Sequence, residues 1–397
     1  MGIIDKKQQL LGYTHEIQKM LAEYRLRRVV DYIQYNNPRY VFSQMSRDLD
    51  IPLSTILRYM EKLRSPNIRF RADFNIGDLD LKLVVLKFKG KSLSKHEIEK
   101  LPYRHWIAAA INDTTNSSLI MYRIPLIMDE ADIIEDTILK LRVSQNLEYR
   151  QILSMSMLAK PSFTYYMNYA PLDPINAIEV NDNHPIVSRY IDYNELVKTR
   201  QRTSLSIVKD KIDLFGLAVA EFNVLDLEEK LEAYFKMIRK TRRLMKNIKT
   251  HIEHISSIIR GNRMISLNRG NLKMIIVGRA RTGCLENLGQ RMLTYLYTYS
   301  IAVNPETGGY VISFDVPPGR GSGVTRAYVG TIVNYVNSLC SNSVIDTIIY
   351  NSRSVVEYFT IPFQNYDYIA KTWIIDNSIL ERYLNKWRKN GLIFYLL

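Results

Sequence analysis

Cysteine is scarce in this sequence, because its 397 residues include only Cys284 and Cys340. The two cysteines form no Cys-x-x-Cys pair and have no histidine pair beside them, so the sequence indicates neither a disulfide framework nor a zinc site. Long apolar runs are also missing: no window of about 18 uncharged apolar residues occurs that could cross a membrane. The N-terminal stretch carries charges throughout, unlike a signal peptide. We therefore expect a protein of a reducing, intracellular compartment with no membrane partner.

Enzyme motifs are missing as well. The sequence has no His-Glu-x-x-His, no Gly-x-Ser-x-Gly and no phosphate-binding loop with its lysine. His251 and His254 lie three residues apart on an expected helix, but further metal ligands are not recognisable in the sequence. A solvated or phosphate-facing histidine pair is the expectation. The sequence thus predicts no enzyme, no metal and no cofactor.

Acidic residues are too few to balance the basic ones. Lys and Arg number 54 against 40 Asp and Glu, a formal net charge of +14 that is spread along the chain. A polyanionic partner is one interpretation of this charge, and a solvated basic surface is the other. The length is sufficient for two to four domains of ordinary size.

Apolar periodicity near the N-terminus predicts three short helices, at residues 25–36, 41–49 and 54–63. A turn at Ile51-Pro52 separates the second helix from the third. Residues 68–74 then alternate between apolar and charged side chains, as in a strand with its arginines on one face. Three helices followed by such a strand predict a winged helix-turn-helix that reads a DNA groove. A structural helical bundle with solvated charges is the alternative.

The next stretch predicts a sheet domain. Residues 81–158 follow a strand-helix-strand-strand-helix-strand order, which gives a four-stranded antiparallel sheet with both helices on one face. This is the ferredoxin-like arrangement. Its acidic residues fit turn and cap positions better than catalytic roles.

These residues resemble a known family. The stretch "MSRDLDIPLSTILRYMEKLRSPNIRFRADFNIGDLDLKLVVLKFKG" is similar to the winged helix-turn-helix, hinge and first strand of the leucine-responsive regulatory protein/AsnC family of transcription regulators. Asp50 stands where that family commonly has glycine, and aspartate tolerates the left-handed backbone that the turn requires. The resemblance covers residues 25–158 and implies DNA binding and a ferredoxin-like domain for effector binding and oligomerisation.

The same pattern returns in the second half of the chain. With one residue deleted before the wing, Ile68-Arg69 aligns with Ile259-Arg260, and "LKLVVLKF" aligns with "LKMIIVGR". Helices are predicted at residues 211–222, 227–238 and 241–255, followed by a second strand-helix-strand-strand-helix-strand order. No glycine or proline separates the last two helices, so a degenerate winged helix that only packs or dimerises is the alternative for this copy.

The predicted fold is therefore α+β: a winged helix-turn-helix followed by a ferredoxin-like βαββαβ domain, with the pair repeated in one chain. The predicted boundaries are 1–76 and 77–158 for the first pair, 159–209 for a linker rich in Tyr and Pro, 210–268 and 269–360 for the second pair, and 361–397 for a C-terminal helical tail.

Predicted DNA contacts come from both copies. They are Ser54, Thr55, Arg58, Tyr59, Lys62, Arg64, Arg69 and Arg71 in the first copy, and Arg242, Arg243, Lys246, Lys249, Arg260 and Arg263 in the second. The glycine-rich loop at 317–323, with Gly319, Gly321 and Gly323, is a candidate site for a small effector, and a purely structural loop is the alternative.

The leading functional prediction is a sequence-specific regulator of transcription that binds double-stranded DNA, with a small-molecule effector and homodimerisation as further expectations. Two alternatives stay open: a nonspecific architectural DNA-binding protein, and a metabolite-binding or enzymatic protein whose helical domains are structural. The composition and the resemblance suggest an archaeal, nucleoid-associated protein of the cytoplasm.

Overall fold

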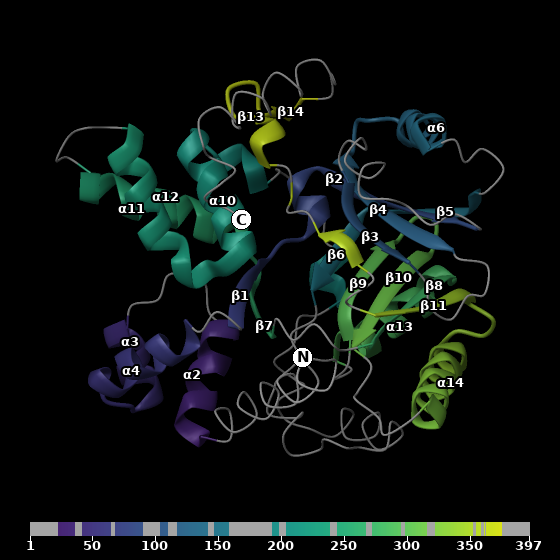
Figure 1. Ribbon diagram of the computed structural model, residues 1–397, viewed down its shortest axis with the longest axis horizontal. Coiled ribbons are helices and arrows are strands. Elements are labelled where there is room, and N and C mark those ends of the chain that lie inside the picture. Colours follow the sequence, from purple (N-terminus) through teal and green to yellow (C-terminus); the bar gives the residue numbers. More distant parts are fainter. Residues whose placement is uncertain are drawn as a thin grey trace, which may run out of the picture.

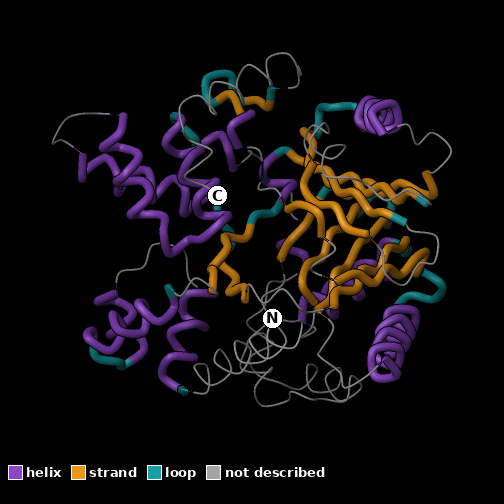
Figure 2. Tube along the Cα trace, in the orientation of Figure 1, coloured by secondary structure: helices purple, strands orange, loops and turns teal. Residues whose placement is uncertain are grey.

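The computed structural model describes residues 23–35, 42–64, 68–89, 104–109, 117–141, 147–158, 193–197, 204–238, 244–266, 272–294, 298–315, 322–351, 355–358, 361 and 363–374. Two groups of helices lie on one side of the molecule, and two antiparallel sheets lie on the other (Figure 1; Figure 2). This arrangement confirms the α+β class. In the described part of the chain, no helix combines the length and apolar character needed to cross a membrane.

The first helical unit contains α2 (Tyr24–Tyr35), α3 (Phe42–Leu49) and α4 (Leu53–Leu63). The predicted helices at 25–36, 41–49 and 54–63 are each within one residue of these bounds, because the spacing of buried apolar residues fixed them. The turn between α3 and α4 contains Asp50 at a φ of 52°. That left-handed angle is one that aspartate adopts more readily than most residues, so the turn forms without glycine.

The predicted wing is not an exposed strand. β1 (Ile68–Asp73) pairs antiparallel with β7 (Gly261–Ser266), and the register places Arg71 opposite Arg263. α10 (Lys211–Asn223) packs against β1, and every residue of the strand except Arg69 is buried. The expectation of a solvent-facing row of arginines is therefore wrong at Arg71, because this strand joins the two halves of the chain.

The second helical unit contains α10, a short 3-10 turn η4 (Val224–Asp226), α11 (Leu227–Ile238) and α12 (Leu244–Ile258). A Cβ at Gly216 of α10 would lie 2.2 Å from Cδ1 of Ile255 of α12. Glycine therefore leaves room for the Ile255 side chain at this close approach, and a larger residue would force that side chain to move. The expected helices at 211–222 and 227–238 match α10 and α11.

The first sheet has the strand order β12-β3-β4-β2-β5. Its strands are β2 (Leu81–Phe88), β3 (Arg104–Ala109), β4 (Ser118–Pro125), β5 (Leu147–Leu153) and β12 (Val355–Tyr358). α6 (Glu130–Leu141) covers its outer face and packs Ile133 and Ile134 against Val84, Leu86 and Ile120.

The second sheet has the strand order β11-β8-β10-β9-β6. Its strands are β6 (Met155–Leu158), β8 (Leu272–Arg279), β9 (Thr298–Asn304), β10 (Gly309–Asp315) and β11 (Val344–Asn351). α13 (Thr282–Thr294) and α14 (Ser322–Leu339) pack on its outer face.

Each sheet takes its fifth strand from the other half of the chain. The predicted strand at 148–158 divides at Ser154: β5 stays in the first sheet, and β6 pairs with β9 in the second. Reciprocally, β12 of the second half pairs with β3 in the first sheet. The prediction of a four-stranded sheet in each half is thus wrong, because edge pairing between the halves adds a strand to both.

The inner faces of the two sheets belong to one continuous apolar core with both helical units. Polar contacts also join the sheets: Gln151 Nε2 donates to the Gly278 carbonyl at 3.0 Å, and Lys87 Nζ lies 2.8 Å from Asp346 Oδ2. The halves are therefore packed as parts of one body.

Short segments in the predicted linker, just before β2 and near the C-terminus also pack on this body. α9 (Tyr193–Val197) and the 3-10 turn η3 (Ser204–Ile207) lie in the predicted linker, and the 3-10 turn η1 (Ile76–Leu79) leads into β2. The C-terminal part contains η5 (Phe363–Asn365), β13 (Tyr366–Asp367) and β14 (Thr372–Trp373). Trp373 Nε1 donates to the Leu79 carbonyl at 2.7 Å. The expected helices at 92–101 and 378–389 lie outside the described residues.

The two cysteines form a disulfide, contrary to the sequence prediction. Cys284 lies in α13 and Cys340 follows α14, with their Cα atoms 5.8 Å apart. The 56 residues that separate them gave no local signal, since only the packing of α13 beside α14 brings them together.

Candidate functional site

A cluster of histidine and aspartate side chains lies where α10 meets α12. Asp210 is the N-cap of α10, and its carboxylate accepts hydrogen bonds from the amides of Ile212 and Asp213. Asp213 lies one turn into the helix, and His251 and His254 are one turn apart on α12. Residues three apart share one face of a helix, so each helix presents a pair of polar side chains to the other. We refer to Asp213, His251 and His254 as the histidine–aspartate cluster.

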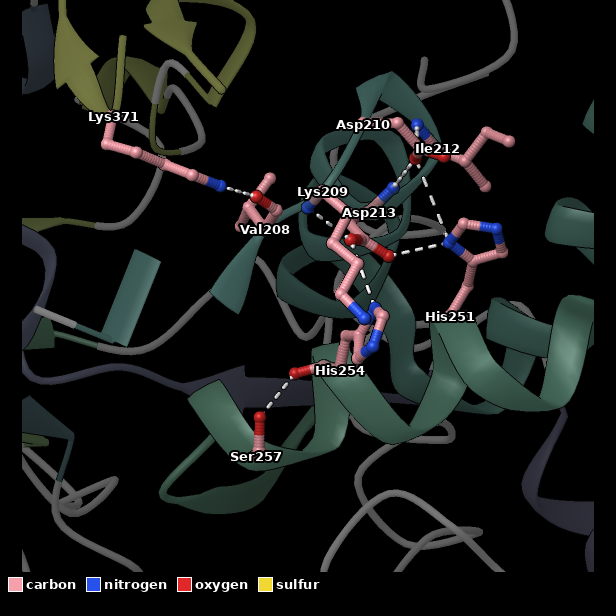
Figure 3. Close-up of polar contacts among 9 residues, drawn as sticks. All are labelled: Val208, Lys209, Asp210, Ile212, Asp213, His251, His254, Ser257 and Lys371. Atoms are coloured by element: carbon pink, nitrogen blue, oxygen red, sulfur yellow. Dashed lines mark hydrogen bonds and ion pairs between the residues drawn. The ribbon is translucent and has the colours of Figure 1, made fainter. Parts of the chain in front are cut away.

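Both imidazoles of the cluster point at one carboxylate (Figure 3). His251 Nδ1 lies 2.7 Å from Asp213 Oδ1, and His254 Nδ1 lies 3.3 Å from Asp213 Oδ2. The side chain of Asp213 is 0% exposed, whereas His251 and His254 keep 11% and 14% of their surface. The expectation of a solvated or phosphate-facing histidine pair is therefore wrong, because Asp213 draws both rings inward.

Asp213 has an unusual set of partners for a buried carboxylate. Besides the two imidazoles it accepts the backbone amide of Lys209 at 2.8 Å. Within the described residues, no lysine or arginine side chain forms an ion pair with it. Its position near the N-terminus of α10 favours a negative charge, but only by a fraction of what burial costs. The cluster thus combines a buried carboxylate with two imidazole rings that contact it directly.

The structure places the predicted contacts of the first copy in two different environments. Ser54, Arg58, Lys62 and Arg64 are exposed and Thr55 is partly exposed on or just after α4. Tyr59 is buried and donates its hydroxyl hydrogen to Glu23. That hydrogen bond is the largest cause that lowers the pKa of Glu23. Tyr59 is therefore a packing residue and not one that reaches base edges.

The arginines predicted to lie along a phosphate backbone are held by the protein instead. Arg71 Nε donates to the Glu221 carbonyl oxygen at 2.9 Å, and the Arg69 guanidinium lies 3.8 Å from the centre of the Phe222 ring. Arg263 is 2% exposed and donates to the Tyr299 carbonyl oxygen. Arg260 forms an ion pair with Asp78 at 2.5 Å. The contacts of Arg69, Arg71 and Arg260 join the two halves of the chain. Because Arg71 and Arg263 are buried, they are not available to a duplex.

The structure says little about the remaining predicted residues. Lys249 is exposed on α12. The surroundings of Lys246 on α12 and of Gly323 on α14 are not described, and Arg242, Arg243, Gly319 and Gly321 lie outside the described residues.

A pocket lies between α9 and α13, apart from the histidine–aspartate cluster. It has a volume of about 490 Å³ and is lined by Asn194, Gly283, Glu286, Asn287 and Gln290. Burial and the nearby charge of Glu286 raise the pKa of Tyr193 to about 12. This lining offers amide groups and one carboxylate but no histidine, so it has fewer chemical possibilities than the cluster.

Sequence reasoning found the two histidines but missed the aspartates. The signal was present as two pairs with the same spacing, "DKID" at 210–213 and "HIEH" at 251–254. A three-residue spacing places each pair on one helical face. The pairs could be matched only by knowing that α10 and α12 pack face to face.

The chain has distant counterparts among solved structures. No protein-family model and no curated protein matches it. A crystal structure of the siroheme decarboxylase NirDL aligns with a TM-score of 0.47 and 9% identity over 91% of this chain and 97% of that chain. The same decarboxylase in complex with an iron-uroporphyrin III analogue aligns with a TM-score of 0.41 and 12% identity over 94% of this chain and 100% of that chain. A structure titled anthrone oxidase-like protein aligns with a TM-score of 0.28 and 9% identity, covering 74% and 97% of the two chains.

These findings correct two predictions, that the chain is a DNA-binding transcription regulator and that it is not an enzyme. The solved structures that align over more than nine-tenths of this chain include the decarboxylase NirDL alone and in complex with the iron-uroporphyrin III analogue, and the buried Arg71 and Arg263 agree with the correction. Because both TM-scores lie below 0.5, the roles of residues are argued below from this chain's own geometry.

Proposed function

We propose that this chain is an enzyme or metabolite-binding protein that takes an anionic small molecule, with the histidine–aspartate cluster as its functional centre. The observation that carries this proposal is the fully buried carboxylate of Asp213 between two imidazoles. A carboxylate that is hydrogen-bonded to Nδ1 of a histidine fixes the orientation of the ring. The arrangement is therefore suited to proton transfer or to holding a ligand.

The charge of the chain supports an anionic ligand. The formal net charge is +14, which raises the local concentration of small anions by long-range attraction. The imidazoles retain exposed edges of 11% and 14%, so a ligand can reach them without unfolding the helices. An imidazolium at either position would pair with a ligand carboxylate or phosphate.

We further propose that the chain consists of two copies of one winged-helix and ferredoxin-like unit, with the boundaries 1–158 and 210–360, related to the regulator family that the first copy resembles. Support comes from the antiparallel pairing of β1 with β7, in which equivalent strands meet at Arg71 and Arg263. The exchange of β6 and β12 between the sheets is equally reciprocal. In this interpretation the helical units are scaffolds that no longer read DNA.

Selective labelling of imidazoles with ¹⁵N tests the function. The full-length chain would be titrated with small carboxylates, phosphate esters and an iron-uroporphyrin, and H251Q and H254Q would assign the two signals. We expect at least one compound to shift both signals in a saturable way, and D213N to weaken its binding at least tenfold. E229Q, which removes an exposed charge on α11, is the matched control and should bind normally. Binding that is unchanged in D213N, or no response from either imidazole, would reject the proposal.

A further inference from the structure

The two copies carry different side chains at the same place. The alignment that pairs the wings places Tyr59 on His251 and Lys62 on His254, since 251 minus 59 and 254 minus 62 are both 192. Each pair lies on the third helix of its unit, α4 or α12. The first copy can therefore be compared with the histidine–aspartate cluster of the second copy, position by position.

A carboxylate faces this pair in both copies. In the first copy, Glu23 accepts the hydroxyl hydrogen of Tyr59 and forms an ion pair with Lys62 at 3.2 Å. Glu23 immediately precedes α2, as Asp213 lies near the start of α10. The first copy therefore balances its carboxylate with a permanent cation, the lysine ammonium.

The second copy replaces that cation with imidazoles while burying the carboxylate more deeply. The Asp213 side chain is 0% exposed, against 39% for Glu23. Burying a carboxylate costs free energy unless partners in the fold compensate its charge. Lysine and arginine partners are absent for Asp213 among the residues that the structure describes. The geometry points to a divalent transition-metal ion, such as Zn²⁺, Co²⁺ or Fe²⁺, held by Asp213, His251 and His254.

The distances fit this assignment. One ligating atom of each residue lies within 4.8 Å of the others. Metal–ligand bonds of about 2.1 Å in tetrahedral geometry separate ligand atoms by about 3.4 Å. His254 Nδ1 is already 3.3 Å from Asp213 Oδ2, and the 2.7 Å between His251 Nδ1 and Asp213 Oδ1 needs to widen by about 0.7 Å for tetrahedral geometry. Two imidazole nitrogens with a carboxylate oxygen select a transition metal over Ca²⁺ or Mg²⁺, which prefer all-oxygen sites.

A fourth ligand is available at the edge of the cluster. Asp210 Oδ1 lies 3.8 Å from His251 Nδ1, and its side chain is 38% exposed. It can move to the metal, or leave that coordination position to water or to a ligand, as catalytic sites do. Other groups surround the proposed metal ligands. The Lys209 amide donates a hydrogen bond to Asp213, and the centre of the Phe235 ring lies 5.3 Å from the centre of the His251 ring. Such an outer shell holds metal ligands in place and limits access of water.

Titration with Co²⁺ alone tests the site without any metabolite, using the full-length chain after removal of any histidine tag. We expect one equivalent to bind and to produce the visible absorption of a four- or five-coordinate ion, which Zn²⁺ then displaces. The inference shares its site with the proposed function, but loss of Co²⁺ binding with metabolite binding intact would reject the metal alone. Metabolite binding lost with Co²⁺ binding intact would reject only the proposed function.

The variant that tests the metal site most directly places the residues of the first copy in the second. H251Y/H254K installs the residues of the first copy, which keep a carboxylate satisfied without metal, and should fold by circular dichroism while losing Co²⁺ affinity at least a hundredfold. D213N should lose affinity by a similar factor. E253Q, on the exposed side of α12 between the two histidines, is the matched control and should bind Co²⁺ as the wild type does. Co²⁺ affinity that is unchanged in H251Y/H254K, or no binding by the wild type, would overturn the inference.

Discussion

Glu221 shows how single charges hold distant parts of this chain together. Its buried carboxylate lies 2.8 Å from Arg123 Nη1 of β4 and 3.6 Å from Arg71 Nη2 of β1, and it accepts the Ile361 amide at 2.5 Å. All three charged side chains are at most 12% exposed. In such surroundings each charge depends on its partners, since removal of one leaves the others buried and uncompensated.

The variant E221Q should therefore lose about 3–5 kcal/mol of unfolding free energy, because both arginines would lose their counterion. Urea unfolding monitored by tryptophan fluorescence measures this loss. E228Q, an exposed carboxylate on α11, is the control and should change stability by less than about 0.5 kcal/mol. Equal stability of E221Q and wild type would show that packing, and not charge, holds this junction.

Asp31 on α2 gives a pH-dependent prediction. Burial raises its pKa from 3.8 to about 6, and Arg27 offsets this only in part. The folded state thus holds the proton more tightly than the unfolded state. This contribution to stability is fully present below pH 3.8 and is lost as the pH rises through about 6.

The variant D31N lacks this loss and should be more stable than wild type at pH 7.5 by roughly 3 kcal/mol, because the shift is about two pKa units and each unit corresponds to about 1.4 kcal/mol. The gain should shrink at pH 4.5, where wild-type Asp31 is largely protonated. Urea unfolding at the two pH values measures both numbers. If D31N is stabilised equally at both pH values, the gain comes from packing and not from the ionisation of Asp31.

At the scale of elements, α13 and α14 are tied together as well as packed on the second sheet. The disulfide between Cys284 and Cys340 spans 56 residues of sequence. A cross-link of this kind stabilises mainly by restricting the unfolded chain. The pair therefore reinforces the half of the chain that carries the histidine–aspartate cluster.

Reduction of this disulfide should lower the unfolding free energy by about 2–4 kcal/mol. Thermal unfolding with and without dithiothreitol measures the effect. The variant C284S/C340S should show the lower stability from the start and no response to the reductant. A wild type that does not respond to reductant, although its thiols are shown to be free, would contradict the prediction.

At the scale of the whole molecule, the two halves complete each other. β1 pairs with β7, β6 joins the second sheet, and β12 joins the first. One apolar core runs through both helical units and the inner sheet faces. Neither half has a complete sheet or a covered inner face without the other.

Cutting the chain between residues 158 and 193 should therefore give two fragments that fold only together. Expressed alone, each fragment should bind the dye ANS and aggregate, because its inner sheet face is exposed. Co-expressed fragments should elute as one complex at the size of the intact chain. Two separately folded, monomeric fragments would show that the exchanged strands are dispensable.

Several features were determined by the sequence alone. The helices of both units follow the spacing of apolar residues such as Leu26, Val30 and Ile33, which are buried as predicted. The left-handed turn at Asp50 was also expected, and its φ of 52° confirms it. These features depend on interactions within about four residues, which periodicity and backbone preference describe.

Only the tertiary structure determined which side chains remain exposed to solvent and which distant residues meet. Arg71 looked like a solvent-facing wing residue until a strand about 190 residues later covered it, and Asp213 met His251 across 38 residues. The pairing of strand edges and the packing of helices are set by the global fit of apolar faces, which no local pattern contains. The sequence therefore determined the elements and their charge, whereas the tertiary packing buried Tyr59, Arg71 and Arg263 among the predicted DNA contacts and assembled the histidine–aspartate cluster.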